Sequence, residues 1–371
     1  MKLAFALFKY FPYGGLQRDC IKIARECLQR GHTVDLYCLE WNGPQIPGIN
    51  VNLIKVNCWR NYRRYEIFAQ SVKQQIDALK YDGVVGFNRM PGLDLYFGAD
   101  SCFALKCAQR PFWYRLLPRS KSFLCAEKEV YGQNSLTQIM LLSDQEIPDI
   151  QKLYGTQGLR FHILPPGVDR DRLAPVDYMQ QRLEFRRRLD ISEDQKLLLM
   201  VGSGFRTKGV DRAIDALASL PKHHQQKCIL VILGRDNSAP FKRQARQLGL
   251  EKQVRFMGGR DDAAQFFFAA DILVHPAYRE AAGMVLLEAV AAQLPVLVTD
   301  SCGYSYHIER SQAGRVHHSP FNPQRFCCEL IEMLEEDSSE QRQQAAREYL
   351  ARTDIFGLAT KATDLIEQVL S

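Results

Sequence analysis

Two glutamates, Glu280 and Glu288, are the side chains of this sequence with the clearest chemical potential. Glu280 follows the apolar run 271–274, which predicts a buried strand, and Glu288 lies in the run 283–292, which predicts a helix. We therefore expect Glu280 at the carboxyl end of a strand and Glu288 roughly two turns into the next helix. Acids at this spacing also occur on solvated helix faces, but the small residues around this pair and the apolar strand before it favour a site.

The main chain between the two glutamates adds donors. The first amides of a helix have no acceptor within the helix, and the helix dipole favours a phosphate there. Gly283 has no Cβ, so a ligand can approach the backbone closely. The amides in question belong to Ala282, Gly283 and Met284. This arrangement suits a nucleotide sugar, with one carboxylate for sugar hydroxyls, the amides for the diphosphate and the other carboxylate for the ribose.

A glycine-rich loop, residues 202–209, follows the apolar run 196–201 and carries the cations Arg206 and Lys208. Amides and cations together can hold a diphosphate. In a transfer reaction the cations would stabilise the departing nucleoside diphosphate as its charge develops. A solvated loop is the alternative. The functional interpretation is favoured because this loop and Glu280 are expected at the same edge of one sheet.

Three further segments hold candidates for the donor site. Gly14 and Gly15 form a turn before the predicted helix 16–30, and Asp19 lies one helical turn later, facing either the site or solvent. Arg172 follows Pro165-Pro166-Gly167 and is either a donor contact or a surface charge of an arginine-rich linker. Arg260 follows Gly258-Gly259 after a short predicted strand, where the backbone either receives a nucleobase or forms a plain loop.

The predicted strand 83–87 leads into polar residues that are candidates for an acceptor site. They are Asn88, Asp94 and Asp100. Each is alternatively a cap or a turn residue.

Residues 103–131 combine cations with aromatic rings. The cations are Lys106, Arg110, Arg115, Arg119, Lys121 and Lys128, against Glu127 and Glu129, and the interleaved rings include Phe112, Trp113, Tyr114 and Phe123. This net charge of +4 with bunched rings suits an anionic membrane surface. Nucleic acid favours similar mixtures, but no nucleic-acid fold motif is present, so we expect no nucleic-acid partner. A helical insert with solvated charges is the alternative, and residues 59–65 have a similar composition.

The elements that must position these residues alternate along the chain. Predicted strands of the first half are 3–8, 33–39, 51–56, 83–87, 138–142 and 161–164, with helices 16–30, 63–80 and 144–154. Predicted strands of the second half are 196–201, 228–233, 254–257, 271–274 and 295–299, with helices 210–220, 241–248, 263–269, 283–292 and from about 323 onward.

This alternation predicts an α/β protein with two doubly wound, Rossmann-like domains, residues 1–167 and 168–353. The break at Pro165-Pro166-Gly167, and the polar stretch that continues to about Gln195, mark the boundary. Ligands of such sheets bind at the carboxyl ends of the strands, and the cleft between two such domains is the expected site.

Composition restricts the function classes. With 371 residues, 46% of them hydrophobic and 24% charged, the chain is typical of a soluble globular protein. No apolar run reaches the roughly 18 residues of a membrane span, and residues 1–8 fit a first core strand better than a signal peptide. Eleven irregularly spaced cysteines predict reduced core thiols of a cytoplasmic protein rather than disulfides or a metal site. The absence of GxGxxG and P-loop motifs argues against a dehydrogenase and a kinase.

The chain resembles retaining glycosyltransferases of the GT-B type, and more closely the lipopolysaccharide core glucosyltransferase I family. The motifs that carry the resemblance are Lys9-Tyr10-Phe11-Pro12-Tyr13-Gly14-Gly15-Leu16-Gln17-Arg18-Asp19, Gly86-Phe87-Asn88-Arg89-Met90-Pro91-Gly92-Leu93-Asp94 and His275-Pro276-Ala277-Tyr278-Arg279-Glu280-Ala281-Ala282-Gly283. The resemblance implies transfer of glucose from UDP-glucose, with an α-1,3 link, to a heptose of the lipopolysaccharide inner core in Gram-negative bacteria.

The resemblance also implies roles for individual residues. Gly15 and Asp19 would lie at the donor diphosphate and sugar, and Lys208 would hold the diphosphate. Glu280 would hold glucose hydroxyls and Glu288 the uridine ribose, with the amides of residues 282–284 completing the pocket. The family has adjacent arginine and lysine where this chain has Thr207-Lys208, and Arg206 is the candidate for the missing cation.

The implied mechanism uses neither metal nor cofactor. UDP would leave from the face that the acceptor approaches, a phosphate oxygen would take the acceptor proton, Glu280 would position the sugar, and Asp100 would orient the acceptor. The resemblance further implies contact of the basic-aromatic insert with the inner leaflet of the inner membrane, and a last helix, 354–371, that packs on the first domain. Alternatives are another UDP-hexose, another anionic glycolipid acceptor, a GT-B-shaped sugar-nucleotide epimerase or phosphorylase, and a non-catalytic membrane-binding module.

Overall fold

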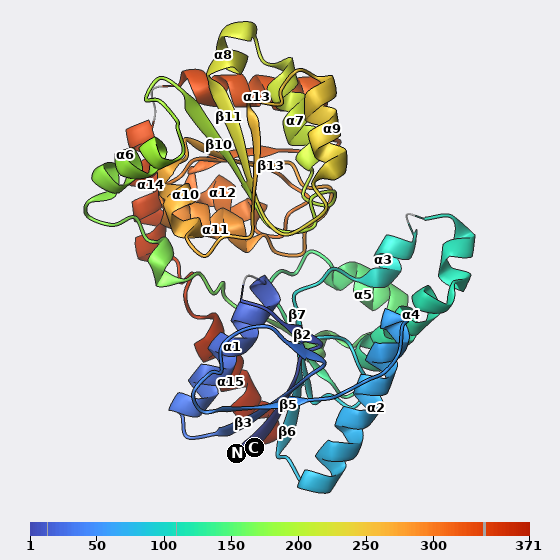
Figure 1. Cartoon of the computed structure of the whole chain (residues 1–371). Helices are drawn as coiled ribbons and strands as arrows, with labels where there is room; N and C mark the ends of the chain where they lie inside the picture. Colours follow the sequence, from blue (N-terminus) through green and yellow to red (C-terminus); the bar gives the residue numbers. More distant parts are fainter. Residues whose placement is uncertain (13, 109, 337–338) are drawn as a thin grey trace. The chain divides into compact units, whose positions relative to one another are not determined.

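The computed structural model describes residues 1–12, 14–108, 110–336 and 339–371, so Tyr13 of the first quoted motif and Gln109 of the insert lie outside it (Figure 1). The chain forms two compact units. The first comprises Met1–Gly167 together with Gly357–Ser371, and the second comprises Val168–Phe356. The first boundary falls at the Pro165-Pro166-Gly167 break, and the second falls after Phe356 rather than after residue 353.

The first unit contains a seven-stranded, all-parallel sheet with strand order β5-β3-β1-β6-β7-β8-β9. The strands are β1 (Lys2–Ala6), β3 (Thr33–Cys38), β5 (Ile49–Leu53), β6 (Gly83–Gly86), β7 (Leu95–Gly98), β8 (Gln138–Leu141) and β9 (Phe161–Ile163), and β2 (Lys9–Tyr10) pairs separately with β4 (Glu40–Trp41). Helices α2 (Asn61–Leu79), α3 (Phe103–Ala108), α4 (Pro118–Tyr131) and α5 (Ile147–Tyr154) pack on one face. Two short 3₁₀ turns are η1 (Phe112–Leu116) and η2 (Gly158–Arg160). Strand β7 was not predicted.

The other face of this sheet carries α1 (Gly15–Gln29) and α15 (Leu358–Leu370), which lie side by side (Figure 1). Arg30 binds Asp364 at 2.8 Å and Glu367 at 2.9 Å, so charge pairs as well as apolar packing attach the last helix to the first unit. Gly83 makes room for it, because a Cβ there would lie 2.1 Å from Leu370. The helix begins at Leu358, four residues later than expected from the sequence.

The second unit contains a six-stranded, all-parallel sheet with strand order β12-β11-β10-β13-β14-β15. The strands are β10 (Lys196–Val201), β11 (Cys228–Leu233), β12 (Val254–Gly258), β13 (Ile272–His275), β14 (Val296–Thr299) and β15 (Gly314–His317). One face carries α7 (Val210–Ser219), α9 (Ala239–Gln247) and α13 (Pro323–Glu335), with α8 (Lys222–Lys227) beside α7. The other carries α6 (Tyr178–Arg188), α10 (Ala263–Ala269), α11 (Met284–Ala291), α12 (Ser305–Ser311) and α14 (Ser339–Arg352) (Figure 1). Strand β15 and helices α6, α8 and α12 were not predicted.

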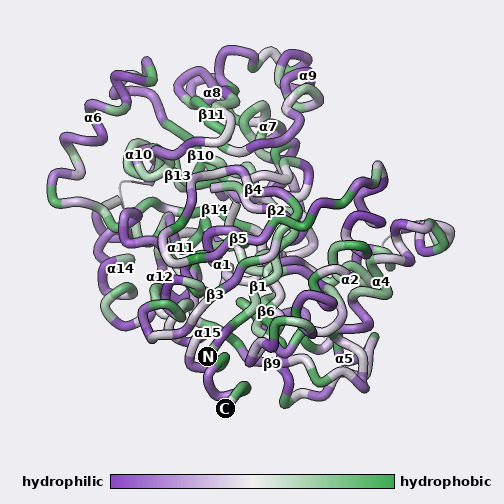
Figure 2. The backbone as a smooth tube through the Cα atoms, turned by 60° about the horizontal axis from the view of Figure 1, so that its bottom comes forward, coloured by the Kyte–Doolittle hydropathy of each residue, from purple (hydrophilic) through white to green (hydrophobic). Residues whose placement is uncertain are grey.

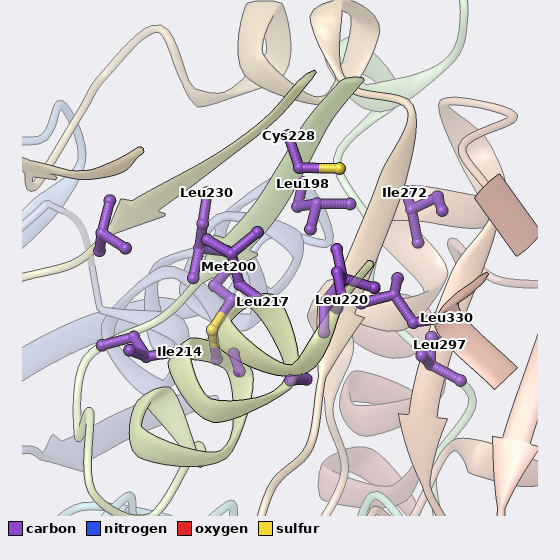
Figure 3. Packing of buried hydrophobic residues seen from close by; sticks show 14 of the residues in the cluster. Leu198, Met200, Ile214, Leu217, Leu220, Cys228, Leu230, Ile272, Leu297 and Leu330 are labelled. Atoms are coloured by element: carbon purple, nitrogen blue, oxygen red, sulfur yellow. The ribbon is translucent and has the colours of Figure 1, made fainter. Parts of the chain in front are cut away.

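The core of the second unit explains why its strands read as continuous apolar runs. Strands of a parallel sheet are covered by helices on both faces, so consecutive side chains are all buried. Figure 3 shows Leu198, Leu230 and Ile272 from three neighbouring strands packing with Leu217 of α7 and Leu330 of α13. Each fully buried leucine or isoleucine contributes about 1.5–3 kcal/mol. The packed sheet therefore presents the loops at its carboxyl edge from fixed positions.

The polar stretch after the first boundary is not a solvated linker. It carries α6 and is mostly hydrophilic in colour (Figure 2). Arg182 and Arg186 of this helix nevertheless reach the Asp271 carboxylate at 2.8 and 3.0 Å, and Arg186 is buried. Opposite charge and backbone carbonyl acceptors compensate the burial of these guanidinium groups. The stretch is therefore part of the folded second unit, which does not fit the arginine-rich linker that was the alternative for Arg172.

The predicted α/β class with two doubly wound units is confirmed. Most of the eleven cysteines are buried, as predicted for core thiols. Among the helices that the structure describes, none combines the length and the apolar character needed to cross a membrane.

Candidate active site

Two loops meet at the carboxyl edge of the second sheet. The glycine-rich loop follows β10 and the Glu280 loop follows β13, and these strands are neighbours. The Tyr278 amide donates to the Thr207 carbonyl at 2.8 Å. Gly209, at φ +76°, lies so close that a Cβ would sit 2.1 Å from the Pro276 carbonyl oxygen. The prediction that both loops share one sheet edge is confirmed.

At this junction the Lys208 ammonium forms an ion pair with the Glu280 carboxylate. The side chains are 20% and 16% exposed, so a ligand can reach them. Gly202, at φ +133°, leaves the space that the lysine stem crosses, because a Cβ there would lie 3.1 Å from Lys208 Cε. The geometry thus joins the predicted diphosphate cation to the predicted sugar carboxylate.

His275 completes the environment of Glu280, with Nε2 2.6 Å from the carboxylate Oε2. Burial by itself raises the pKa of Glu280, but the charge of Lys208 and the contact with His275 outweigh it and hold that pKa well below its ordinary value. Glu280 is therefore an ionised hydrogen-bond acceptor, suited to sugar hydroxyls and not to proton donation. His275 stood in the quoted motif without an assigned role.

A third loop, after β14, supports Glu280 and was missed from the sequence. The Glu280 amide donates to the Ser301 carbonyl at 3.0 Å, and the Gly303 amide donates to the Glu280 carbonyl at 3.1 Å. The Thr299 hydroxyl donates to the Ala277 carbonyl at 2.8 Å. The available signal was Cys302-Gly303 directly after an apolar strand.

Helix α11 begins at Met284 after Gly283, which adopts φ +93°. The amides of residues 282–284 thus lie where the helix dipole is positive, next to Glu280 in the chain. Glu288 is the fifth residue of α11, just over one turn in rather than two. The position expected for Glu288 within the helix was therefore wrong.

Arg172 lies in a 3₁₀ turn, η3 (Arg170–Arg172), beside Glu288. Its Nε is 3.6 Å from Glu288 Oε1, and the two side chains are only 7% and 6% exposed. Arg172 also binds Asp171 at 2.7 Å. Arg172 is therefore a buried partner of Glu288 and not a surface charge. The donor role predicted for each of the two stays a prediction.

The remaining cations of this sheet edge differ from one another. Arg206 is exposed, on the glycine-rich loop. Arg260, after the outer strand β12, is paired with Asp262 at 2.7 Å, and this contact lowers the pKa of Asp262. Strand β11 lies between β10 and β12 in the sheet, and the loop that follows β11 was not predicted to belong to the site. Its Asp236 accepts the Phe205 amide at 2.8 Å and so supports the start of the glycine-rich loop.

In the first unit, Gly14 and Gly15 open α1 directly after β2. Gly14 leaves room for Gln17, because a Cβ would lie 1.7 Å from its Oε1. At Gly15 a Cβ would meet no atom of the described residues within 4 Å, so the backbone there is accessible to a ligand. Asp19 is buried, which contradicts the solvated alternative.

The three acceptor candidates do not lie together. Asn88 follows β6, and its Oδ1 accepts the Phe8 amide at 2.7 Å, which ties it to the loop after β1. Asp100 is exposed just after β7. Asp94 instead precedes β7, and its carboxylate accepts the Val84 amide at 2.8 Å. Its expected place beside the other two is wrong, because it caps the amino ends of the strands, at the opposite edge of the sheet.

Comparison with known proteins gives the family of the chain. Residues 181–349 match the family model described as glycosyl transferases group 1. The chain is 41% identical over 368 residues to lipopolysaccharide glucosyltransferase WaaG of Escherichia coli strain K12, covering 99% of this chain and 98% of that protein.

The chain belongs to the glycosyltransferase family that includes WaaG.

Solved structures support the same assignment. The crystal structure of WaaG, described as a glycosyltransferase involved in lipopolysaccharide biosynthesis, superimposes on this glycosyltransferase with a TM-score of 0.95, covering 98% of this chain and 99% of the other. Anabaena HepE in complex with UDP-glucose shares the fold, with a TM-score of 0.76, 18% identity and coverage of 99% and 100%. The fold predicted as GT-B is confirmed.

The basic-aromatic insert of this glycosyltransferase is a surface feature of the first unit. Phe112 is 81% exposed and Trp113 is 53% exposed, on the 3₁₀ turn between α3 and α4. The predicted cations Lys106, Arg110, Arg115, Arg119, Lys121 and Lys128 are all exposed, whereas Tyr114 is half-buried. Glu127 is completely buried and bound to Arg89 at 2.9 Å. Only Glu129 therefore opposes these cations on the surface of the described insert.

Proposed function

We propose that this enzyme transfers glucose from UDP-glucose to a heptose of the lipopolysaccharide inner core, with retention of the anomeric configuration. Family membership supports transfer to a lipopolysaccharide, because the 41% identical relative carries that activity in its name and the similarity runs over the whole chain. The ion pair of Lys208 with Glu280, beside the start of α11, is the observation in the structure that carries the proposal.

The donor diphosphate lies between Lys208 and the first amides of α11. Lys208 supplies a mobile charge and the amides supply fixed donors, so both stabilise the negative charge that develops on the departing UDP. Because Glu280 already holds Lys208, the cation is positioned before the donor arrives and little reorganisation remains. Glu280 accepts hydrogen bonds from the glucose hydroxyls, and Glu288, oriented by Arg172, binds the ribose.

The reaction proceeds on one face of the sugar. The bond between glucose C1 and the diphosphate oxygen breaks, and the acceptor hydroxyl oxygen bonds to C1 from the same face. The acceptor proton passes to an oxygen of the leaving phosphate. Neither metal nor cofactor is required in this scheme, because Lys208 and the α11 amides provide the positive charge. The low pKa of Glu280 keeps it out of proton transfer.

The acceptor binds at the carboxyl edge of the first sheet. Asn88 and Asp100 follow the adjacent strands β6 and β7. Asp100 is the exposed carboxylate of this group and orients the acceptor hydroxyl. Asp94 has no part in this site because of its place at the opposite edge.

The insert attaches the enzyme to the anionic inner leaflet of the inner membrane, where a lipid-anchored acceptor is found. The exposed cations meet lipid phosphates while Phe112 and Trp113 enter the interface. The burial of Glu127 by Arg89 strengthens this interpretation, because it removes an anion from the docking face.

A donor and acceptor panel tests the activity. The enzyme is incubated with UDP-glucose, UDP-galactose or UDP-N-acetylglucosamine and a heptose-terminated lipopolysaccharide, and the anomeric configuration of the product is read by NMR. We expect preferred transfer of glucose with an α link. Preference for another donor, a β product, or epimer formation from the donor alone would each contradict the proposal.

Vesicle co-sedimentation tests the membrane contact. Binding to anionic vesicles should exceed binding to zwitterionic vesicles, and should fall with added salt because exposed charges are screened. The double substitution Phe112→Ala and Trp113→Ala should weaken binding. Leu159→Ala is the matched control, since Leu159 is an equally exposed apolar residue of the same unit outside the insert. Equal losses in both proteins would argue against docking through the insert.

A further inference from the structure

Three metal-ligating side chains converge behind the donor site. The imidazole of His275, the carboxylate of Glu280 and the thiol of Cys302 each offer a donor atom, and these atoms all lie within 4.8 Å of one another. His275 and Cys302 are completely buried, whereas Glu280 is reachable from the side of Lys208. They come from the end of β13, the loop that follows it and the loop after β14.

We propose that these three residues bind a soft divalent cation of the Zn²⁺ class and that the bound ion inhibits the enzyme. The binding stands on the geometry alone, whereas the inhibition rests on the proposed role of Glu280 in holding the donor sugar.

The donor set selects the class of ion. Thiolate and imidazole ligands favour zinc and similar soft cations, whereas magnesium and calcium favour oxygen ligands. Zinc bonds of 2.0–2.3 Å place tetrahedral ligand atoms about 3.5 Å apart. The present separations of at most 4.8 Å therefore need to close by no more than about 1.3 Å. The side chains can supply such a movement without a change of fold.

The existing contacts decide which atoms bind the ion. Lys208 binds Glu280 Oε1, so the ion takes Oε2, which now faces His275 Nε2 at 2.6 Å. His275 Nδ1 is buried without a hydrogen-bond partner in the described structure, so it can accept the proton that Nε2 gives up. The Cys302 proton is released to solvent, and a sulfur–metal bond forms in its place.

Inhibition follows from the loss of Glu280 as an acceptor. A carboxylate oxygen bound to zinc no longer receives hydrogen bonds from the sugar, and the ion's charge weakens the hold of Glu280 on Lys208. Both effects act on the groups that position the donor. Removal of the ion by a chelator restores them, because Cys302 then takes a proton back from solvent and His275 returns its proton to Nε2.

A second cluster in the same unit provides an internal comparison. His223, His224 and Glu335 also have ligand atoms within 4.8 Å of one another, but His223 and Glu335 are exposed and the cluster contains no sulfur. It lies on α8 and at the end of α13. A cation held there has no thiolate ligand and touches no residue of the donor site.

Cobalt spectroscopy and zinc inhibition test the proposal together. Cys125 and Cys328, the exposed cysteines, are first replaced by serine to give a parent protein. Co²⁺ is added to the parent, to Cys302→Ser and to His224→Ala, and the sulfur-to-cobalt charge-transfer absorption is recorded without substrate. The parent and His224→Ala should show this absorption, and Cys302→Ser should lack it.

The transferase rate is then measured with increasing Zn²⁺, as a ratio to the rate of the same protein with chelator. The zinc concentration for half inhibition should rise at least about 100-fold in Cys302→Ser, since even indirect partners of a metal are worth 10–100-fold in affinity. Absence of the absorption in the parent would refute the site even if Cys302→Ser failed to fold. Equal inhibition of parent and variant would refute the link to activity, whereas failure of glucose transfer itself would leave the cobalt spectrum unchanged.

Discussion

Replacement of Lys208 by methionine is the sharpest test of the donor site. The substitution keeps most of the apolar stem that passes over Gly202 and removes the ammonium group. Loss of one preorganised group that stabilises transition-state charge costs about 3 kcal/mol. Since each 1.36 kcal/mol is tenfold, kcat/KM for transfer should fall roughly 150-fold.

The assay measures UDP release with saturating acceptor over a range of UDP-glucose and pH. Because Lys208 lowers the pKa of Glu280 while burial raises it, the variant should have a higher pKa at Glu280 than the wild type. The pH profile of kcat/KM should then show an acid limb in the variant, where protonation of Glu280 lowers the rate. In the wild type Glu280 stays ionised far below its ordinary pKa and gives no such limb.

Lys252→Met is the matched control, because Lys252 is an exposed lysine of the same unit away from the described site loops. It should retain wild-type kcat/KM. The free energy of unfolding of the Lys208 variant, measured by denaturant titration, should be about 2 kcal/mol lower, since the Glu280 carboxylate loses a charged partner. A folded Lys208→Met protein with near-normal kcat/KM would refute the role of this cation in departure of UDP.

Three further outcomes follow from other parts of the second unit. Gly202→Ala should lower transfer at least about tenfold, because the added Cβ would press on Lys208. Gly204→Ala is the control: Gly204 also has a positive φ, but a Cβ there meets no described atom within 4 Å, so the variant should show backbone strain of only about 1 kcal/mol and near-normal kcat/KM. Equal activity losses in the two variants would exclude the contact with Lys208 as the cause. Arg172→Met should destabilise the protein by about 3 kcal/mol in urea unfolding, because the cation beside the buried Glu288 is removed, and the double substitution with Glu288→Met should recover most of the loss. Burial, aided by the charge of Arg310, lowers the pKa of His307 from 6.5 to about 4. Between pH 6.5 and pH 4 the unfolded chain therefore binds more protons than the folded protein. The free energy of unfolding should fall by about 3 kcal/mol as the pH falls from 6.5 to 4. His307→Gln should show a correspondingly weaker pH dependence.

The sequence was sufficient to predict where the central pair would meet. Apolar runs such as 196–201 and 228–233 have the length and composition of strands buried on both faces, and the structure confirms them. Once a parallel sheet is assigned, the loops after neighbouring strands must share its carboxyl edge. Lys208 and Glu280 could therefore be placed near each other although 72 positions separate them.

Errors arose where a side chain's partner lies far away in sequence. Asp94 is an exception, because its partner Val84 is only ten positions away; it was misplaced because the four-residue strand β7, which starts directly after it, was not predicted. The arginines of α6 have the composition of a solvated linker, and only the packing of α6 on the sheet brings Asp271 to them. Glu127 was counted among surface charges for the same reason.

Local patterns of apolar residues, glycines and prolines thus determined most of the elements, their order and the edge at which chemistry takes place, because strand and helix periodicity depends on short-range sequence and alternating strands and helices favour a parallel sheet. Tertiary structure alone decided which charges are buried, and with which partner. Examples are Arg172 with Glu288, Glu127 with Arg89, and the place of His275 and Cys302 around Glu280. The physical reason is that a buried charge must find its counterion across elements that sequence spacing does not relate.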